Sequence, residues 1–387
     1  MAKRHAGGPD LVSQIRRCQE LLIARSGADE FHETIRLLIA KAFCERESGA
    51  ALVTHERAQK TLATHAGEVS RFVEGPPNLT APAAVVDECL RTLAPTCLHE
   101  AGYEALDAAF EGLTAPEYKS NKGQYFTPRH VVDFCVDVIA PRDGEAGCDP
   151  ACGSGAFLRA CDAFAARKRR RVALHGYEIS HRAARIGALM SFLACDDRFV
   201  VEQLDSLLTN ASARRTGGAP TIEDSLLRQR RDAFDFIVTN PPFAGDVAAA
   251  AYADDYETAR DGAARIERDV LFLERCLMLL ADGGRLAVVL PDNKVSARKF
   301  DALRRWLLDR ARIVAVVSLH AYTFKPHTSQ KACVVFLTRT RTPSARPILF
   351  YRSDRPGKTS SGAPVLRDGA IDHDLGEIAK DLAKEWR

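Results

Sequence analysis

The sequence predicts an α/β chain in which a mostly parallel, seven-stranded sheet follows an all-helical N-terminal domain. Up to about residue 113, apolar residues recur every three or four positions, which is the helical period. From about residue 120, short β-branched runs alternate with amphipathic helical runs, a pattern typical of a parallel sheet covered by helices on both faces. We therefore expect a helical domain over 1–113, an α/β domain over 114–340 and a C-terminal tail over 341–387.

The helical period is clearest in three N-terminal runs, at 11–23, 31–43 and 85–93. Gly75-Pro76-Pro77-Asn78 interrupts the pattern between the second and third runs, because proline has no backbone N–H and cannot continue a helix. The sequence contains no β-rich stretch before residue 113, so we expect this domain to be built from helices alone.

Seven short apolar runs are predicted to be the strands of the sheet: 147–149, 172–178, 199–203, 234–239, 285–291, 313–319 and 332–337. Helical patterns fill most of the gaps between them, at 155–168, 180–195, 268–281 and 296–310. Gly283-Gly284 is the expected helix end before the strand at 285, and a short polar helix is expected over 374–387.

Composition limits the classes of function. The 54 basic and 51 acidic residues give a net charge of +3, too small to attract a polyanion over the whole surface. No apolar stretch reaches the ~20 residues that cross a bilayer, and the polar start lacks a secretory signal, so we expect a cytoplasmic protein without a membrane partner. The eleven cysteines include no Cys-x-x-Cys pair, which favours reduced, buried thiols and no metal site.

The first chemical motif is Asp149-Pro150-Ala151-Cys152-Gly153-Ser154-Gly155, between a predicted strand and a predicted helix. Glycines allow the backbone to approach a ligand closely, and N–H groups at a helix start can meet an anion. The motif lacks the Lys-Ser/Thr of a P-loop and the third glycine of a dinucleotide fingerprint. Glu178 follows at the end of the next strand, where ribose hydroxyls are bound in folds of this kind, and Asp205 follows the strand after that. Three acids at successive strand ends predict a nucleoside ligand.

The second motif is Asn240-Pro241-Pro242-Phe243, directly after the strand at 234–239. The two prolines restrict the backbone at and before them. The Asn240 oxygen and a backbone carbonyl can then accept two hydrogen bonds from one amino group, while Phe243 can stack on a base. This geometry suits methylation of an exocyclic amine, because orienting the nitrogen lone pair toward the methyl donor raises its reactivity.

With these motifs in this order, the sequence resembles DNA adenine-specific (amino) methyltransferases from about Tyr118 to Leu337. The resemblance is greatest to the modification subunit of type I restriction-modification systems, and the run 271–292 matches the helix and strand that follow the second motif. It implies a Rossmann-like, S-adenosylmethionine-dependent methyltransferase sheet. It also implies site-specific transfer of a methyl group to the N6 amino group of adenine in DNA.

The same resemblance assigns the site residues. The catalytic residues would be Asn240, Pro241, Pro242 and Phe243. The residues that bind S-adenosylmethionine would be Gln124, Tyr125, Phe126, Thr127, Pro128, Arg129, Asp149, Ala151, Cys152, Gly153, Glu178 and Asp205. Tyr125 and Phe126 are also weaker candidates for stacking on the base.

Two segments depart from the family pattern or stand apart from it. In the string 324–332, Ser329 and Ala332 replace a glycine and a threonine beside the target-base pocket. The segment 244–269 carries seven acids against three arginines, so we expect it to be mobile or to face a partner. The resemblance implies double-stranded DNA as the substrate and a restriction or translocase subunit as a further partner. Nothing in the chain resembles a base-reading module, which predicts a separate DNA-specificity subunit.

Other readings of the motifs remain open. Methylation of the N4 amino group of cytosine needs the same geometry as methylation of adenine. A non-catalytic scaffold that binds the cofactor or DNA within a defence complex belongs to a different class. Methylation of a protein glutamine uses a similar Asn-Pro-Pro motif, but the long helical N-terminus and the string 124–129 favour DNA.

Overall fold

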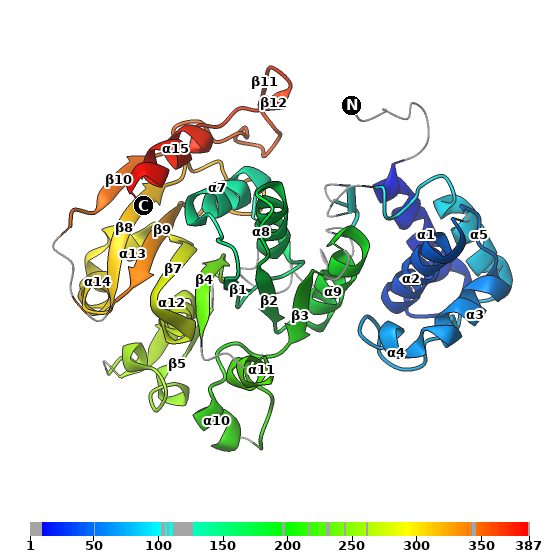
Figure 1. Cartoon of the computed structure of the whole chain (residues 1–387), viewed down its shortest axis with the longest axis horizontal. Coiled ribbons are helices and arrows are strands. Elements are labelled where there is room, and N and C mark those ends of the chain that lie inside the picture. The colour runs from blue at the N-terminus through cyan, green and yellow to red at the C-terminus, as the bar shows by residue number, and fades with distance from the viewer. Residues whose placement is uncertain are drawn as a thin grey trace. The chain divides into compact units, whose positions relative to one another are not determined.

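The chain forms two compact units, Met1–Lys119 with His181–Arg198, and Ser120–Ser180 with Phe199–Arg387 (Figure 1). The computed structural model describes residues 10–49, 51–101, 105–106, 108–110, 127–195, 198–215, 217–229, 233–243, 245–260, 262–340, 342 and 346–385. The division places 181–198 with the N-terminal helices. The boundaries expected at 113/114 and 340/341 stay predictions.

All the named elements of the first unit are helices, as the periodicity predicts. They are α1 (Leu11–Arg25), α2 (Glu30–Ser48), α3 (His55–Thr64), α4 (Ala66–Val69), α5 (Ala83–Leu93) and α9 (His181–Cys195). Asp10 and Asp29 cap α1 and α2, because their carboxylates accept the backbone N–H groups of Ser13 and His32 at 2.8 and 2.9 Å. Gly49 ends α2 in the left-handed conformation, which costs glycine little.

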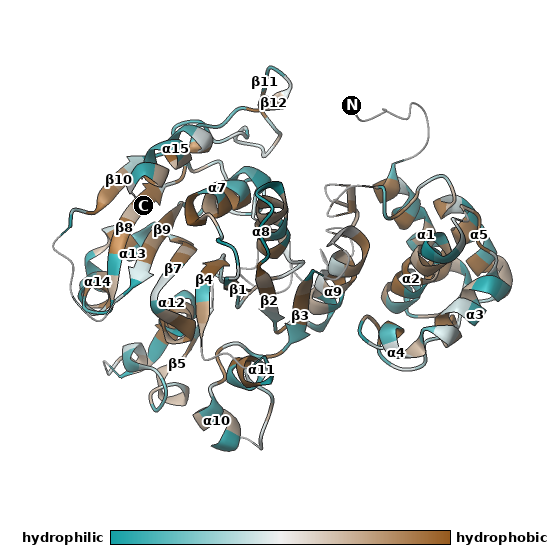
Figure 2. Ribbon diagram, viewed as in Figure 1, coloured by the Kyte–Doolittle hydropathy of each residue, from teal (hydrophilic) through white to brown (hydrophobic). Residues whose placement is uncertain are grey.

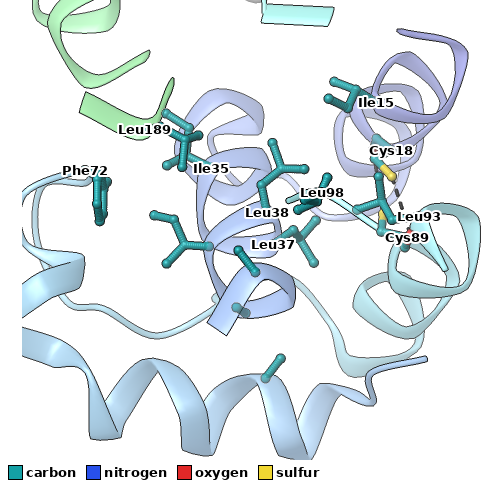
Figure 3. Packing of buried hydrophobic residues seen from close by; sticks show 14 of the residues in the cluster. Ile15, Cys18, Ile35, Leu37, Leu38, Phe72, Cys89, Leu93, Leu98 and Leu189 are labelled. Carbon is teal, nitrogen blue, oxygen red and sulfur yellow. Dashed lines mark hydrogen bonds between the residues drawn. The ribbon is translucent and has the colours of Figure 1, made fainter. Parts of the chain in front are cut away.

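The core of this unit lies between α1, α2, α5 and α9 (Figure 3). Ile35 and Leu38 on α2 are fully buried, as is Leu189 on α9. Thus α9, which follows a strand of the other unit in the chain, buries its apolar face among the N-terminal helices. Within the described residues, no helix of the protein is long and apolar enough to span a bilayer.

The second unit is built on an eight-stranded sheet with the order β10-β8-β9-β7-β4-β1-β2-β3. The strands are β1 (Ala146–Asp149), β2 (Ala173–Glu178), β3 (Phe199–Gln203), β4 (Phe234–Thr239), β7 (Leu280–Pro291), β8 (Ala311–Ser318), β9 (Ala332–Arg339) and β10 (Leu349–Arg352). All neighbouring pairs are parallel except those made by β9, which runs antiparallel to β7 and β8. The predicted mostly parallel sheet is confirmed, with one strand more than expected.

Helices cover both faces of this sheet. The helices of this unit are α7 (Arg129–Ile139), α8 (Ala156–Arg167), α10 (Asn210–Arg215), α11 (Ile222–Arg228), α12 (Arg268–Leu279), α13 (Asn293–Ser296), α14 (Asp301–Leu308) and α15 (Leu375–Glu385), with short 3-10 turns at Ala249–Ala251, Glu257–Ala259 and Arg298–Phe300. Among them, α7, α8, α12 and α14 pack on the sheet. Consecutive residues of β9 point to opposite faces of the sheet. Val335 lies in one core with Leu277 of α12, whereas Phe336 meets Phe134 of α7 edge to face at 5.4 Å. The central strands are accordingly hydrophobic (Figure 2).

Three local predictions differ from the structure. Helix α12 ends at Leu279 and β7 begins at Leu280, so Gly283 bends the start of a strand, with φ 78°, instead of ending a helix. The helix expected over 296–310 is divided into α13, a 3-10 turn and α14. The tail expected after residue 340 supplies β10, which pairs with β8.

The acidic segment expected to be mobile or to face a partner forms a packed hairpin in its described part. Strands β5 (Asp246–Ala248) and β6 (Arg265–Glu267) pair antiparallel. Between them, Tyr256 is fully buried and donates its hydroxyl to the backbone oxygen of Leu207 at 2.7 Å. This packing differs from a mobile loop, and contact with a partner stays a prediction.

Candidate active site

The sequence motifs meet at one edge of the sheet. Strands β3, β2, β1 and β4 are adjacent and parallel, so their carboxyl ends lie at the same edge. Asp149 ends β1, Glu178 ends β2, Asp205 follows β3 and Asn240 follows β4. The structure therefore brings the two predicted motifs together.

The loop between β1 and α8 is held against the end of β2. The Cys152 N–H donates to the backbone oxygen of Tyr177 at 3.1 Å, and the Gly153 N–H donates to Oε2 of Glu178 at 3.0 Å. Gly176 makes this approach possible, because a Cβ there would lie 2.7 Å from the Cys152 sulfur. Cys152 and Gly153 thus build the loop backbone, and the Cys152 thiol is buried.

The three predicted acids have different environments. Asp149 is buried beneath the loop, where Oδ1 accepts the Ala151 N–H at 3.0 Å, and burial raises its pKa to about 7. Glu178 is also buried, and its two oxygens accept the N–H groups of Gly153 and Ser180. Asp205 is half-buried and accepts the Leu207 N–H at 2.9 Å.

A cavity of about 310 Å³ opens beside these acids. Three predicted cofactor residues line it, namely Ala151, Glu178 and Asp205, together with Pro242 of the second motif. Its carboxylates lie beside the apolar side chains of Ile179 and Phe272, so the cavity offers both hydrogen-bond acceptors and apolar walls.

Sequence reasoning missed several lining residues. Val247 and Tyr252 come from the hairpin after the second motif, and Arg268 and Phe272 come from the start of α12. Burial and the nearby Asp205 raise the pKa of Tyr252. The helical period predicts the helix that carries Arg268 and Phe272, but no pattern in the sequence predicts that these side chains, or Val247 and Tyr252 of the hairpin, line the cavity.

The second motif has a fixed amide. Nδ2 of Asn240 donates to Oγ1 of Thr127 at 2.9 Å. Oδ1 of Asn240 is buried, and no donor among the described residues reaches it. A buried acceptor without a partner is rare in folded proteins, so this oxygen is suited to receive a hydrogen bond from a ligand.

Phe243 is largely buried, and its stacking on a base stays a prediction. Only 7% of its surface is exposed, and its ring meets Phe324 edge to face, with centroids 6.0 Å apart. Phe324 precedes the cis peptide bond between Lys325 and Pro326, in the string that departs from the family pattern. This contact places the β8–β9 connection against the second motif.

The predicted cofactor string before α7 is only partly described. Gln124, Tyr125 and Phe126 lie outside the described residues. Pro128 caps α7, and Nε of Arg129 donates to both carboxylate oxygens of Asp133 at 3.1 and 3.2 Å. Thr127, Pro128 and Arg129 do not line the cavity, and neither do Asp149, Cys152 and Gly153. Their part in cofactor binding stays a prediction.

Comparison with known proteins supports the motif assignment. Residues 103–375 match the model of the N-6 DNA Methylase family. The chain belongs to this family. The resemblance inferred from the motifs is therefore confirmed.

Relatives of this chain include subunits of restriction enzymes. The EcoEI type I restriction enzyme methylase subunit of Escherichia coli is 30% identical over 249 residues, which cover 61% of this chain and 46% of that protein. The HindI type I methylase subunit of Haemophilus influenzae is 25% identical over 272 residues, covering 68% and 56%. The chain thus spans about half the length of these relatives.

The fold is shared with solved structures. The type I restriction-modification system methyltransferase subunit from Streptococcus thermophilus superposes with a TM-score of 0.67 at 17% identity, covering 97% of this chain and 93% of that one. This similarity shows a common fold and confirms the predicted methyltransferase-type sheet with helices on both faces.

Proposed function

We propose that this chain transfers a methyl group from S-adenosylmethionine to the N6 amino group of adenine in double-stranded DNA. The Asn240 amide carries the proposal: Thr127 holds one end of it, and the other end is a buried acceptor that no described residue uses. Membership of the N-6 DNA methylase family supports the choice of adenine.

The residues around the cavity fit the cofactor. When bound, S-adenosylmethionine supplies an electrophilic methyl group carried on a sulfonium. Glu178 and Asp205 would accept hydrogen bonds from its nucleoside part, while Ile179 and Phe272 would cover the faces of its base. The volume of about 310 Å³ lies at the lower end of the range for ligand pockets.

Asn240 would orient the amine for attack. Its Oδ1 would accept one N–H of the target amino group, and the backbone carbonyl of Pro241 would accept the other. The lone pair of the nitrogen would then point toward the cofactor side, where Pro242 lines the cavity. Positioning of this kind accelerates transfer without a strong general base. Reaching the amine in a duplex requires the adenine to leave the stack, at a cost of a few kcal/mol.

Partners would supply recognition of the DNA. The relatives are methylase subunits of type I restriction enzymes by name, and a net charge of +3 gives this chain a weak overall attraction for DNA. We therefore assign it to a restriction-modification or related defence complex, with a separate DNA-specificity subunit and a restriction or translocase subunit. A site-specific, adenine-specific methyltransferase is the activity expected of that complex.

The test is methyl transfer by the complex purified with the products of neighbouring genes. Labelled S-adenosylmethionine should transfer its methyl group to unmodified DNA, and nucleoside digestion should yield N6-methyladenine. Asn240→Ala should abolish transfer and keep cofactor binding in calorimetry, whereas Glu178→Ala should lose cofactor binding. Detection of N4-methylcytosine in the digest would show that the target base is cytosine and not adenine. Cofactor binding without any transfer to DNA would favour the scaffold alternative.

A further inference from the structure

We propose that the C-terminal segment 354–374 is a positioning element for the target-base side of the site. This inference rests on the proposed function, because it assigns a role in the same methyl transfer. The segment follows β10 and lies outside the cofactor cavity. It contacts two neighbours of the second motif. One is the connection between β8 and β9 around Phe324, here called the Phe324 loop, and the other is helix α7.

The first contact is with the Phe324 loop. Nζ of Lys358 donates to the backbone oxygen of Lys325 at 2.9 Å, next to Phe324. Gly362, in the left-handed conformation with φ 92°, lies so close that a Cβ there would be 2.5 Å from the Pro326 ring. The segment therefore supports the turn that presses Phe324 against Phe243.

The second contact is with α7. The rings of His130 and His373 stack with centroids 5.2 Å apart. Helix α15, directly after the segment, packs along α7 (Figure 1). The start of α7 follows Thr127, whose hydroxyl holds the Asn240 amide. One segment thus braces the neighbours of both Asn240 and Phe243.

The segment is itself tied down, so it can act as a support. The carboxylate of Asp374 accepts the Ser353 hydroxyl at 2.6 Å and the Asp354 N–H at 2.8 Å, and its backbone oxygen accepts the Glu377 N–H at the start of α15. Arg355 bonds Asp372 at 3.0 Å and Glu377 at 2.6 Å. These bonds hold the base of the loop that carries Lys358 and Gly362. Displacing a wall of an active site by about 1 Å can cost about 100-fold in rate.

The chain offers a matched pair of variants. Gly362→Ala and Gly369→Ala both place alanine at a positive φ, 92° and 79°, but a Cβ at Gly369 meets no atom within 4 Å. Any loss specific to Gly362→Ala therefore reports contact with Pro326 and not backbone strain. Lys358→Met and Lys358→Arg form a second pair, in which arginine keeps a donor for the Lys325 oxygen.

The experiment measures methyl transfer by the intact complex at saturating S-adenosylmethionine and DNA. We expect Gly362→Ala to lower kcat by about tenfold or more relative to Gly369→Ala. The KM for S-adenosylmethionine should change less than twofold, because the segment does not line the cavity. Lys358→Met should lower kcat, and Lys358→Arg should recover part of the loss.

Equal kcat values for the two glycine variants would overturn the inference. A higher kcat for Gly362→Ala than for Gly369→Ala would also overturn the inference, because the segment would then slow methyl transfer instead of supporting it. The same holds for a loss that appears equally in cofactor affinity, which would indicate general damage. A wild-type complex that binds the cofactor and never methylates DNA would instead refute the proposed function itself.

Discussion

The hydrogen bond between Thr127 and Asn240 gives the sharpest test of the site. Thr127→Val keeps the shape of the side chain and removes the acceptor that receives Nδ2 at 2.9 Å. The amide can then rotate and exchange its oxygen for its nitrogen. Leaving such a donor without its partner costs about 1–3 kcal/mol. If that cost falls on the transition state, the rate decreases about 5- to 150-fold.

Single-turnover methyl transfer by the purified complex measures this rate, and calorimetry measures cofactor affinity. Thr127→Val should lose rate and keep its affinity for S-adenosylmethionine, because Thr127 does not line the cavity. Thr127→Ser retains a hydroxyl and should stay within about threefold of wild type. A valine variant as fast as wild type would refute the anchoring role. Weaker cofactor binding would support the role in cofactor binding that the sequence assigned to this residue.

Three further predictions concern stability and pH. Gly147→Ala should lower the free energy of unfolding by about 1–3 kcal/mol in urea, because the alanine Cβ would lie 2.1 Å from the ring of Phe236. Adding Phe236→Leu should restore part of that loss. Lys294→Met should lower the free energy of unfolding by about 3–5 kcal/mol, because it leaves the fully buried carboxylate of Asp269, 2.8 Å from Nζ of Lys294, without its cation. An unchanged urea midpoint would contradict this. Burial raises the pKa of Asp149 from 3.8 to about 7. Between about pH 4 and pH 7 the folded chain therefore keeps a proton that the unfolded chain has lost. The free energy of unfolding should fall as pH rises through this range, by at most about 1.4 kcal/mol per pH unit. Asp149→Asn should remove that component; equal slopes in both proteins would show that Asp149 does not titrate in this range.

Much of the fold follows from local sequence. The strands β1, β2, β3 and β4 lie where the alternation of short strand-like runs and helical runs predicts them, and the N-terminal helices follow the helical period. Tyr252 of the hairpin and Arg268 at the start of α12 illustrate what local patterns omit. Both line the cavity beside Glu178 and Asp205, yet nothing in their spacing distinguishes them from surface residues.

The motifs and the periodicity predict the family, the mostly parallel sheet and the positions of Asp149, Glu178, Asp205 and Asn240 at strand ends. These features depend on short-range period and on the rule that parallel strands bring their carboxyl ends to one edge. Only the tertiary structure showed that the residue holding the Asn240 amide is Thr127, 113 positions away. It also showed that α9 packs among the N-terminal helices and that the tail adds a strand and braces the Phe324 loop. Those contacts join segments that are distant in the chain, and their energy depends on packing that no local pattern encodes.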